Sequence, residues 1–315
     1  MVVLVTGGAG YIGSELIREM PKSEKFKGET IRILDNMFRE RYVSLWNLPA
    51  DAHYEFIEGD IRKKEDVAKA MKDVTVVYDL AGITNAPLSF EREQLTKEVN
   101  YDGAMVVLEE AARVDAELIY SSSASVYGPT KGIVDETYEC KPVSPYGKYK
   151  LMAELDILKK ARETGMKAHS LRLGTVYGWT IGMRFDTVID RFAYLACIGM
   201  PLTVYDSAVK EKRPYAHVKD VVRGMLFVAG RKEMYGETYN LVAQNAGVGE
   251  VVEAIKQFVP DVQVTITSTP SLNQLSYVLD SSKLQKTGFT YNYPLRDGIK
   301  DIIDKFEAFT RGRQK

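Results

Sequence analysis

The chain of 315 residues is 45% hydrophobic and 27% charged, a composition typical of a globular protein that buries a large core. Its formal net charge of -1 gives no electrostatic reason to expect a nucleic acid or an anionic membrane as a partner. The longest apolar-leaning run, residues 192–205, is too short to span a bilayer. Cys140, Cys197 and the three histidines show no spacing typical of a metal site or a disulfide framework, so we expect free thiols, no metal and a cytoplasmic location.

The N-terminus combines a strand pattern with a glycine-rich turn. Residues 2–5 are a continuous β-branched and aliphatic run, which predicts a strand buried on both faces of a parallel sheet. Glycines follow at three-residue spacing, and an amphipathic helix pattern covers residues 12–19. Such glycines let backbone amides approach a pyrophosphate at the helix N-terminus, although glycine triplets also occur in ordinary turns. The position between strand and helix favours a dinucleotide site, with the glycines at Gly7, Gly10 and Gly13.

Asp35 follows a second predicted strand, residues 31–34. It lies about twenty residues beyond the last glycine, where a carboxylate can accept both ribose hydroxyls and repel a 2′-phosphate. This arrangement favours NAD over NADP. Arg39 and Arg41 keep NADP open, because either guanidinium could reach a phosphate.

Three further strand patterns continue the alternation of strands and helices. Residues 54–61 predict a third strand whose exit carries Asp60, a candidate partner for the adenine amine. Residues 74–80 predict a fourth strand that runs into two small residues, which leave room for a cofactor or serve packing alone. Helix patterns cover residues 65–72 and 98–113, and a strand at 117–120 leads into a serine-rich segment. The alternation predicts an α/β, Rossmann-type doubly wound parallel sheet with ligands at the carboxyl ends of its strands.

Tyr146 and Lys150 stand at the start of a helix predicted to run to about residue 164. Pro145 disfavours helix at the residue before it, so we expect the helix to begin at Pro145. Residues four apart in a helix share one face. An ammonium beside a phenol stabilises the phenolate and lowers the tyrosine pKa, which makes Tyr146 a candidate general base. A tyrosine and a lysine on a solvated helix face would show the same spacing.

Beyond a strand predicted at residues 168–173 the regular alternation fades. A helix pattern at 185–198, a short strand at 202–205 and a helix at 220–229 indicate a smaller C-terminal α/β lobe that closes over the sheet. We therefore predict two units. Residues 1–171, with 214–242 returning to them, form the dinucleotide-binding domain, and residues 172–213 and 243–315 form the substrate lobe.

Three blocks together carry a family resemblance: the glycine loop, residues 121–128, and the Tyr146/Lys150 pair. In this order they resemble the extended short-chain dehydrogenase/reductases that act on nucleotide sugars, with UDP-hexose 4-epimerases nearest. Residues 213–220 are also similar to the family's Arg-Asp-Phe-x-His-Val-x-Asp stretch. The resemblance implies NAD-dependent oxidation at the sugar C4 and return of the hydride to the opposite face. Tyr146 would act as base, Ser123 would bond the same oxygen, and Lys150 would hold the nicotinamide ribose.

The resemblance also implies the remaining contacts and a UDP-hexose substrate. Arg213 matches a diphosphate-binding arginine, and a homodimer is expected through the helices near Asn100 and Tyr146. Cofactor contacts are expected at Gly7, Gly10, Tyr11, Ile12, Gly13, Asp35, Asn36, Asp60, Ile61, Leu80, Ala81, Gly82, Ile83, Thr84, Asn100, Ser121, Tyr146 and Lys150. Substrate contacts are expected at Ser123, Thr175, Thr203, Val204, Tyr205 and Arg213.

The chain departs from the family pattern at several positions. Ala124 and Ser125 stand where 4,6-dehydratases and decarboxylases of the family place acidic residues, which argues against both reactions. Thr175 replaces an asparagine of many 4-epimerases, and no arginine lies between Lys232 and Tyr293 to supply a second phosphate contact. The leading hypothesis is a 4-epimerase. A nucleotide-ketosugar reductase and a non-catalytic dinucleotide-binding protein are the alternatives.

Overall fold

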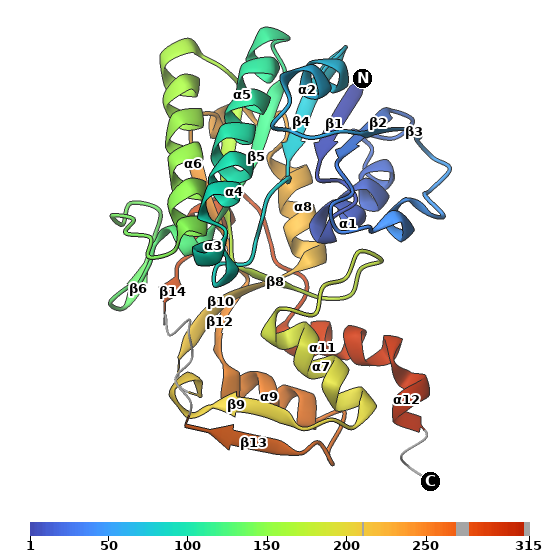
Figure 1. Ribbon diagram of the computed structural model, residues 1–315, viewed down its shortest axis with the longest axis vertical. Coiled ribbons are helices and arrows are strands. Elements are labelled where there is room, and N and C mark those ends of the chain that lie inside the picture. Colours follow the sequence, from blue (N-terminus) through green and yellow to red (C-terminus); the bar gives the residue numbers. More distant parts are fainter. Residues whose placement is uncertain (210, 269–276, 312–315) are drawn as a thin grey trace.

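The computed structural model describes residues 1–209, 211–268 and 277–311. A seven-stranded sheet fills the upper part of the molecule in Figure 1, with the order β11-β7-β5-β4-β1-β2-β3. Every neighbouring pair in it is parallel, so the predicted Rossmann-type doubly wound sheet is confirmed. Its strands are β1 (Val2–Thr6), β2 (Thr30–Asp35), β3 (His53–Glu58), β4 (Val74–Asp79), β5 (Glu117–Ser123), β7 (Ala168–Leu173) and β11 (Thr238–Leu241).

Helices cover both faces of this sheet, because its central strands are apolar on both sides. On one face α1 (Tyr11–Glu19) and α8 (Val218–Val228) pack on side chains such as Val3, Val5 and Ile119. On the other face α2 (Lys64–Ala70), α5 (Ala104–Arg113) and α6 (Pro145–Thr164) pack on Leu4, Val77 and their neighbours. The carboxyl ends of the strands are left open between these layers, and this is where ligands bind in such sheets.

The second lobe lies below the sheet in Figure 1. It contains a three-stranded sheet, in the order β12-β10-β8, and a parallel pair of β9 with β13. Its apolar side chains form a cluster of their own. The elements are β8 (Thr175–Tyr177), α7 (Val188–Ile198), β9 (Leu202–Tyr205), β10 (Lys212–His217), β12 (Gln244–Gly247), α9 (Val248–Lys256), β13 (Val264–Thr267), α11 (Leu295–Lys305) and α12 (Glu307–Arg311).

Shorter elements complete the fold. A parallel pair of two-residue strands, β6 (Ile133–Val134) and β14 (Val278–Leu279), lies beside the sheet. The remaining helical segments are the 3₁₀ turns Met20–Lys22, Tyr42–Leu45, Ala124–Val126, Asp206–Ala208 and Lys232–Met234, the helices α3 (Leu88–Glu91), α4 (Glu93–Lys97) and α10 (Ser282–Lys286), and the π-helical Glu98–Gly103. Among the described residues, no helix combines the length and the apolarity needed to cross a bilayer.

Several predicted boundaries differ from the structure. The helix predicted from residue 98 opens with a π-helical segment, Glu98–Gly103, before regular α5. The helix predicted from residue 185 begins at Val188, because Thr187 has an extended backbone and occupies the N-cap position. The third strand ends at Glu58, and the backbone amide of Asp60 bonds to the Asp66 carboxylate instead of a strand. The division into two domains stays a prediction, although the large sheet does take its last strand, β11, from within 214–242.

The start of α6 is fixed by local chemistry. Ser144 is the N-cap residue, and its hydroxyl accepts a hydrogen bond of 3.1 Å from the backbone N–H of Gly147. Pro145 occupies the first helical position, where its missing N–H costs nothing. The helix ends at Gly165, whose φ of 75° lies in the left-handed region. These signals place Tyr146 in the first turn and Lys150 one turn later.

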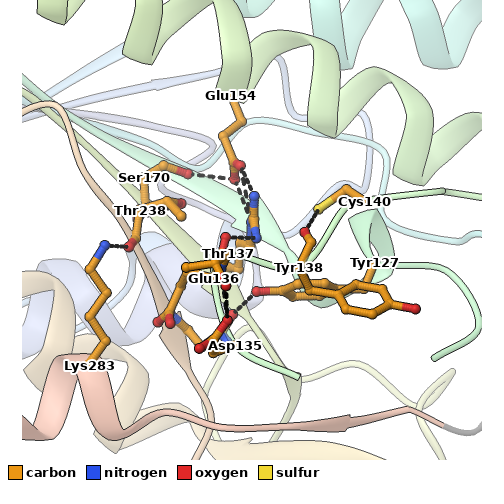
Figure 2. Close-up of polar contacts among 12 residues, drawn as sticks. Tyr127, Asp135, Glu136, Thr137, Tyr138, Cys140, Glu154, Ser170, Thr238 and Lys283 are labelled. Carbon is orange, nitrogen blue, oxygen red and sulfur yellow. Dashed lines mark hydrogen bonds and ion pairs between the residues drawn. The ribbon is translucent and has the colours of Figure 1, made fainter. Parts of the chain in front are cut away.

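A buried ion pair fastens α6 to β7. Glu154 and Arg172 are almost fully buried, and the guanidinium donates from Nη2 to Glu154 Oε1 at 2.6 Å and from Nε to the same oxygen at 3.0 Å. The Ser170 hydroxyl donates to the other carboxylate oxygen at 2.9 Å, and Figure 2 shows Ser170 and Glu154 facing one another. Such a pair stabilises a structure only while both charges are present. It lies one helical turn beyond Lys150.

Arg172→Leu is expected to lower the free energy of unfolding by about 3 kcal/mol, because the buried Glu154 carboxylate would lose its counter-charge. Urea unfolding followed by circular dichroism measures the change. Lys300→Ala is the matched control: it breaks an exposed ion pair with Asp304 and should cost less than about 1 kcal/mol. Equal losses of stability in the two variants would contradict a stabilising role for the buried pair of Glu154 and Arg172.

Candidate active site

A cavity of about 1210 Å³ lies at the carboxyl ends of the parallel strands. It is lined by ends of β1, β2, β4 and β5 from the sheet and by β9 and β10 from the second lobe. Of the predicted site residues, only Asn100 is not among its lining residues. The structure therefore brings together Gly7, Gly10, Tyr11, Ile12, Gly13, Asp35, Asn36, Asp60, Ile61, Leu80, Ala81, Gly82, Ile83, Thr84, Ser121, Ser123, Tyr146, Lys150, Thr175, Thr203, Val204, Tyr205 and Arg213.

The glycine loop forms a cradle at one end of the cavity. Gly7 has a φ of 64°, and a Cβ there would lie 2.8 Å from the backbone nitrogen of Ala81. A Cβ on Gly13 would lie 2.5 Å from the carbonyl oxygen of Gly7, so helix and loop pack too closely for any side chain. Gly10 is the N-cap residue of α1, and no side chain caps that helix. The uncapped N-terminus leaves backbone amides available to a phosphate group.

Asp35 is bound to the glycine loop. Its carboxylate accepts hydrogen bonds from the backbone N–H groups of Ala9 at 3.0 Å and Met37 at 2.9 Å. Burial raises the pKa of Asp35, and these two hydrogen bonds and the charge of Arg41 oppose the rise. The end of β2 thus presents an acceptor beside the cradle, as ribose hydroxyls require. Its role in binding stays a prediction.

Asp60 and Asn100, two further predicted contacts, already have partners within the protein. Asp60 pairs with Arg62 at 2.7 Å, and the hydrogen bonds from Arg62 lower the pKa of Asp60 to about 2. Asn100 accepts from the backbone N–H of Ile83 at 2.8 Å and donates to the carbonyl of Ile83 at 2.9 Å. Asn100 therefore fixes the segment after β4 that lines the cavity, and its contact with a cofactor stays a prediction.

Ser123, Tyr146 and Lys150 meet where β5 ends and α6 begins. The Ser123 hydroxyl accepts from the backbone N–H of Ser125 at 3.1 Å, and it acts on the Tyr146 phenol by opposing the rise of its pKa. Lys150 is 3% exposed, and its ammonium donates to the carbonyl oxygen of Ser121 at 2.9 Å. Burial lowers the pKa of Lys150 to about 8. The solvated-helix-face alternative is wrong, because both Tyr146 and Lys150 are buried and line the cavity.

The sequence predicted a lowered pKa for Tyr146, and this prediction is wrong for the protein without a bound cofactor. Burial raises the pKa of Tyr146, since a phenolate loses its hydration there. The hydrogen bond with Ser123 and the charge of Arg184 oppose this rise, and Lys150 is not among the causes. The phenolate form that a general base needs is therefore supported by Ser123 and Arg184 as well as by any cation that binds later.

Arg184 is a cavity residue that the sequence did not reveal. It lies in the irregular segment between β8 and α7, where no periodicity or motif marks it. Its Nη1 donates to the Thr84 hydroxyl at 3.0 Å, and its Nε and Nη2 pair with the Asp186 carboxylate. Its positive charge acts on Tyr146 and, at the other end of the cavity, on Tyr11. Arg184 thus adds a cation whose charge acts on both Tyr11 of the glycine loop and Tyr146.

The second lobe supplies the other wall of the cavity. On β9, Val204 is buried while Thr203 and Tyr205 are exposed, so one face of this strand packs in the lobe and the other is open to solvent. The Arg213 guanidinium on β10 lies 5.6 Å from the ring centroid of Tyr277, a distance suited to a cation–π contact. Both side chains line the cavity. A flat cation held against an aromatic ring presents donors that suit phosphate oxygens.

Residues 3–241 match the NAD dependent epimerase/dehydratase family. The chain belongs to this family. The Bacillus subtilis protein named "Uncharacterized UDP-glucose epimerase YtcB" is 31% identical over 261 residues, 81% of each chain. The UDP-glucose 4-epimerase of Thermus thermophilus, solved with NAD, is 27% identical, with a TM-score of 0.82 over 98% of this chain and 99% of that one. The UDP-glucuronic acid 4-epimerase of Bacillus cereus, solved with UDP-glucuronic acid and NAD, is 25% identical, with a TM-score of 0.86 over the same shares.

These similarities confirm the predicted family of NAD-dependent nucleotide-sugar epimerases and dehydratases, and the prediction of NAD as its cofactor. The residues of this chain fit the dinucleotide. Gly7 and Gly13 leave the space that a Cβ would fill, α1 is uncapped, and Asp35 stands at the end of β2. Arg39 and Arg41 line the same cavity, and burial lowers the pKa of Arg41 from its usual value.

One buried carboxyl group ties the glycine loop of this family member to its second lobe. Asp190 on α7 is fully buried and accepts from the backbone N–H of Gly178 at 2.9 Å and from the Thr187 hydroxyl at 3.0 Å. The Tyr11 hydroxyl donates to the carbonyl oxygen of Gly178 at 2.6 Å. Burial raises the pKa of Tyr11, and the charge of Asp190 raises it further. Burial raises the pKa of Asp190 to about 7.

Asp190→Asn is expected to flatten the pH dependence of stability. The folded-state pKa lies above that of an exposed aspartate, so wild-type stability is full below about pH 4 and is lost progressively up to about pH 7. Between about pH 5 and pH 8 the wild type should lose about 2 to 3 kcal/mol more than the variant. Urea unfolding at both pH values measures the difference, and parallel losses would refute the role of Asp190.

Proposed function

We propose that the protein is an NAD-dependent nucleotide-sugar 4-epimerase of the UDP-glucose/UDP-galactose type. The observation that carries the proposal is the presence of Tyr146 and Ser123 together in the cavity, with Ser123 followed by two positions, Ala124 and Ser125, that have no carboxyl group. Loss of a hydroxyl group or of carbon dioxide requires further acid–base groups, whereas epimerisation needs one group that takes and returns a proton. The names of the Bacillus subtilis and Thermus thermophilus relatives support this reaction.

The predicted catalytic and substrate-binding residues of the cavity have separate roles in this reaction. Tyr146 takes the proton from the sugar 4-hydroxyl and later returns it, and Ser123 hydrogen-bonds the same oxygen. Bound NAD would supply the redox chemistry by accepting a hydride from the sugar carbon and giving it back. Lys150 holds the ribose beside Tyr146. Arg213 binds the substrate diphosphate, and the Thr203–Tyr205 strand borders the nucleotide base.

A homodimer is part of the proposal. The helices expected to form the dimer contact, around Asn100 and along α6, lie side by side. They leave apolar side chains such as Leu155 exposed to solvent, at 56% of its surface. Tyr101 and Asp156 on this surface bond to one another at 2.8 Å. A second copy would cover these groups.

Tyr146→Phe is expected to reduce the interconversion of UDP-glucose and UDP-galactose by at least about 100-fold, because the group that exchanges the proton is lost. Interconversion is followed by chromatography of the two nucleotide sugars. Tyr149→Phe in the same helix removes a hydroxyl bonded to Glu93, does not affect a residue that lines the cavity, and should leave the rate unchanged.

Three results would count against the proposed reaction. A wild-type protein that converts neither sugar nor their N-acetyl forms would refute it. Turnover proportional to added NAD(P)H would instead indicate a nucleotide-ketosugar reductase. Full activity of Tyr146→Phe would refute the role of Tyr146 as the group that exchanges the proton.

Arg184 favours a second candidate substrate, UDP-glucuronic acid. Its guanidinium lies in the cavity, and its charge reaches Tyr146, where the sugar C4 would react. A carboxylate at C6 of the sugar would lie close to C4 and could pair with such a cation. The Bacillus cereus relative, which is named for and solved with UDP-glucuronic acid, supports this candidate.

Arg184→Gln separates the two candidate substrates. If the substrate is UDP-glucuronic acid, kcat/KM for it should fall by about 10- to 100-fold, the effect of losing one charge-assisted hydrogen bond. Any effect through the pKa of Tyr146 acts on both sugars alike, so the ratio of the two kcat/KM values isolates the carboxylate contact. An unchanged ratio would rule out this use of Arg184.

A further inference from the structure

Asp79 is a buried carboxyl group at the carboxyl end of β4, and the reaction described above does not use it. It is 1% exposed, and the Thr6 hydroxyl donates to its Oδ1 at 2.6 Å. The same hydroxyl accepts from the backbone N–H groups of Leu80 and Ala81, the first residues of the cavity wall after β4. A charge buried this deeply costs free energy unless another charge compensates it.

The register of the sheet places Asp79 in one row with Thr6 and Tyr120. Thr6 pairs with Asp79 across β1 and β4, and Asp79 pairs with Tyr120 across β4 and β5. Residues paired across parallel strands project to the same face of a sheet. Tyr120 belongs to the apolar cluster beneath α5 and α6, so this is the face that carries α6 and Lys150.

Lys150 lies over this row. Its ammonium is 4.7 Å from the ring centroid of Tyr120 and donates to the carbonyl oxygen of Ser121. The hydroxyl of Ser121 in turn donates to the carbonyl oxygen of Asp79 at 2.7 Å. Both of these groups, the Tyr120 ring and the Ser121 carbonyl, are neutral. A full charge on Lys150 therefore depends on a negative charge nearby.

The other ionisable groups around Lys150 do not supply this charge. Glu154, one turn further along α6, is bound by Arg172 and Ser170. Tyr146 and Tyr120 are phenols whose pKa is raised by burial, so both are neutral near pH 7. The negative charge of Asp79, in contrast, raises the pKa of Lys150 against the effect of burial. Burial raises the pKa of Asp79 as well, and the charge of Lys150 and the hydrogen bond from Thr6 oppose that rise.

We propose that Asp79 is a positioning residue whose carboxylate keeps Lys150 in its ammonium form. For its effect on turnover this inference rests on the proposed epimerase reaction, since Lys150 holds the ribose only as a cation. The effect on Lys150 itself does not depend on which sugar is converted. Asp79 thus acts from the sheet on a side chain of α6, through the electrostatic field rather than through a hydrogen bond.

The test compares the titration of Lys150 in the wild type and in Asp79→Asn. Competitive acetylation of the purified full chain from about pH 6 to pH 10, read by peptide mass spectrometry, reports the midpoint at which Lys150 loses its proton. The wild-type midpoint is expected near 8. Without the carboxylate it should fall by about one pH unit or more. As the pH is raised, binding of NAD should begin to weaken at a lower pH in the variant than in the wild type. The epimerase rate of the variant should begin to fall at the same pH.

Three further variants separate this role from a structural one. Asp79→Glu restores the charge and should return the midpoint most of the way to that of the wild type. Thr6→Val removes the hydroxyl that stabilises the Asp79 carboxylate and should shift the midpoint in the same direction as Asp79→Asn, by less. Ser170→Ala removes a buried hydrogen bond from the next position of the same row and should lower the melting temperature without moving the midpoint.

An unchanged Lys150 midpoint in Asp79→Asn overturns the proposal. If that variant does not fold, an unchanged midpoint in Thr6→Val overturns it instead. A shifted midpoint in a protein that converts no nucleotide sugar would support the role of Asp79 and refute the proposed function, so the two failures are distinguishable.

Discussion

The ammonium group of Lys150, held out of water at the carboxyl edge of the large sheet, is the constraint on which the site depends. Moving a cation into such a place is costly, and the pKa of Lys150 falls to about 8 in consequence. The surroundings are arranged to limit that cost. The carbonyl of Ser121 accepts one of its protons, the face of Tyr120 lies against it, and Asp79 contributes a negative field.

Tyr146, the proposed catalytic base, takes its environment from this arrangement. Tyr146 and Lys150 are carried by the same two turns of α6, whose start is set by Ser144 and whose body is fastened to β7 by the pair of Glu154 and Arg172. The helix cannot rotate or slide without breaking that pair. The position of the Tyr146 phenol beside Ser123 is therefore determined by two contacts of α6, one before Tyr146 at Ser144 and one after it at Glu154.

Sequence reasoning succeeded where chemistry and position are local. The glycine loop and Asp35 were predicted because strand, turn and helix follow one another without interruption. Tyr146 and Lys150 were predicted because helical spacing fixes their relation whatever surrounds them. The structure places these residues in one cavity, and the family match covers the segment that contains them.

The features that escaped prediction depend on contacts between distant segments. Arg184 lies in a loop without periodicity, and its importance appears only when that loop is placed beside Tyr146 and Tyr11. Asp79 ends an apolar strand, and only the register of β4 against β5 brings it under Lys150. The direction of the Tyr146 pKa was also wrong, because the four-residue spacing shows the nearby cation but not the loss of hydration.

The bond from Tyr11 to Gly178 joins the glycine loop directly to the second lobe. A phenol anchored in the first turn of α1 donates to the carbonyl group of Gly178, and Asp190 of α7 accepts from the N–H group of the same residue. Any outward swing of the second lobe at this point must first stretch a short hydrogen bond whose donor belongs to α1. The glycine loop and the second lobe are mechanically linked in this fold.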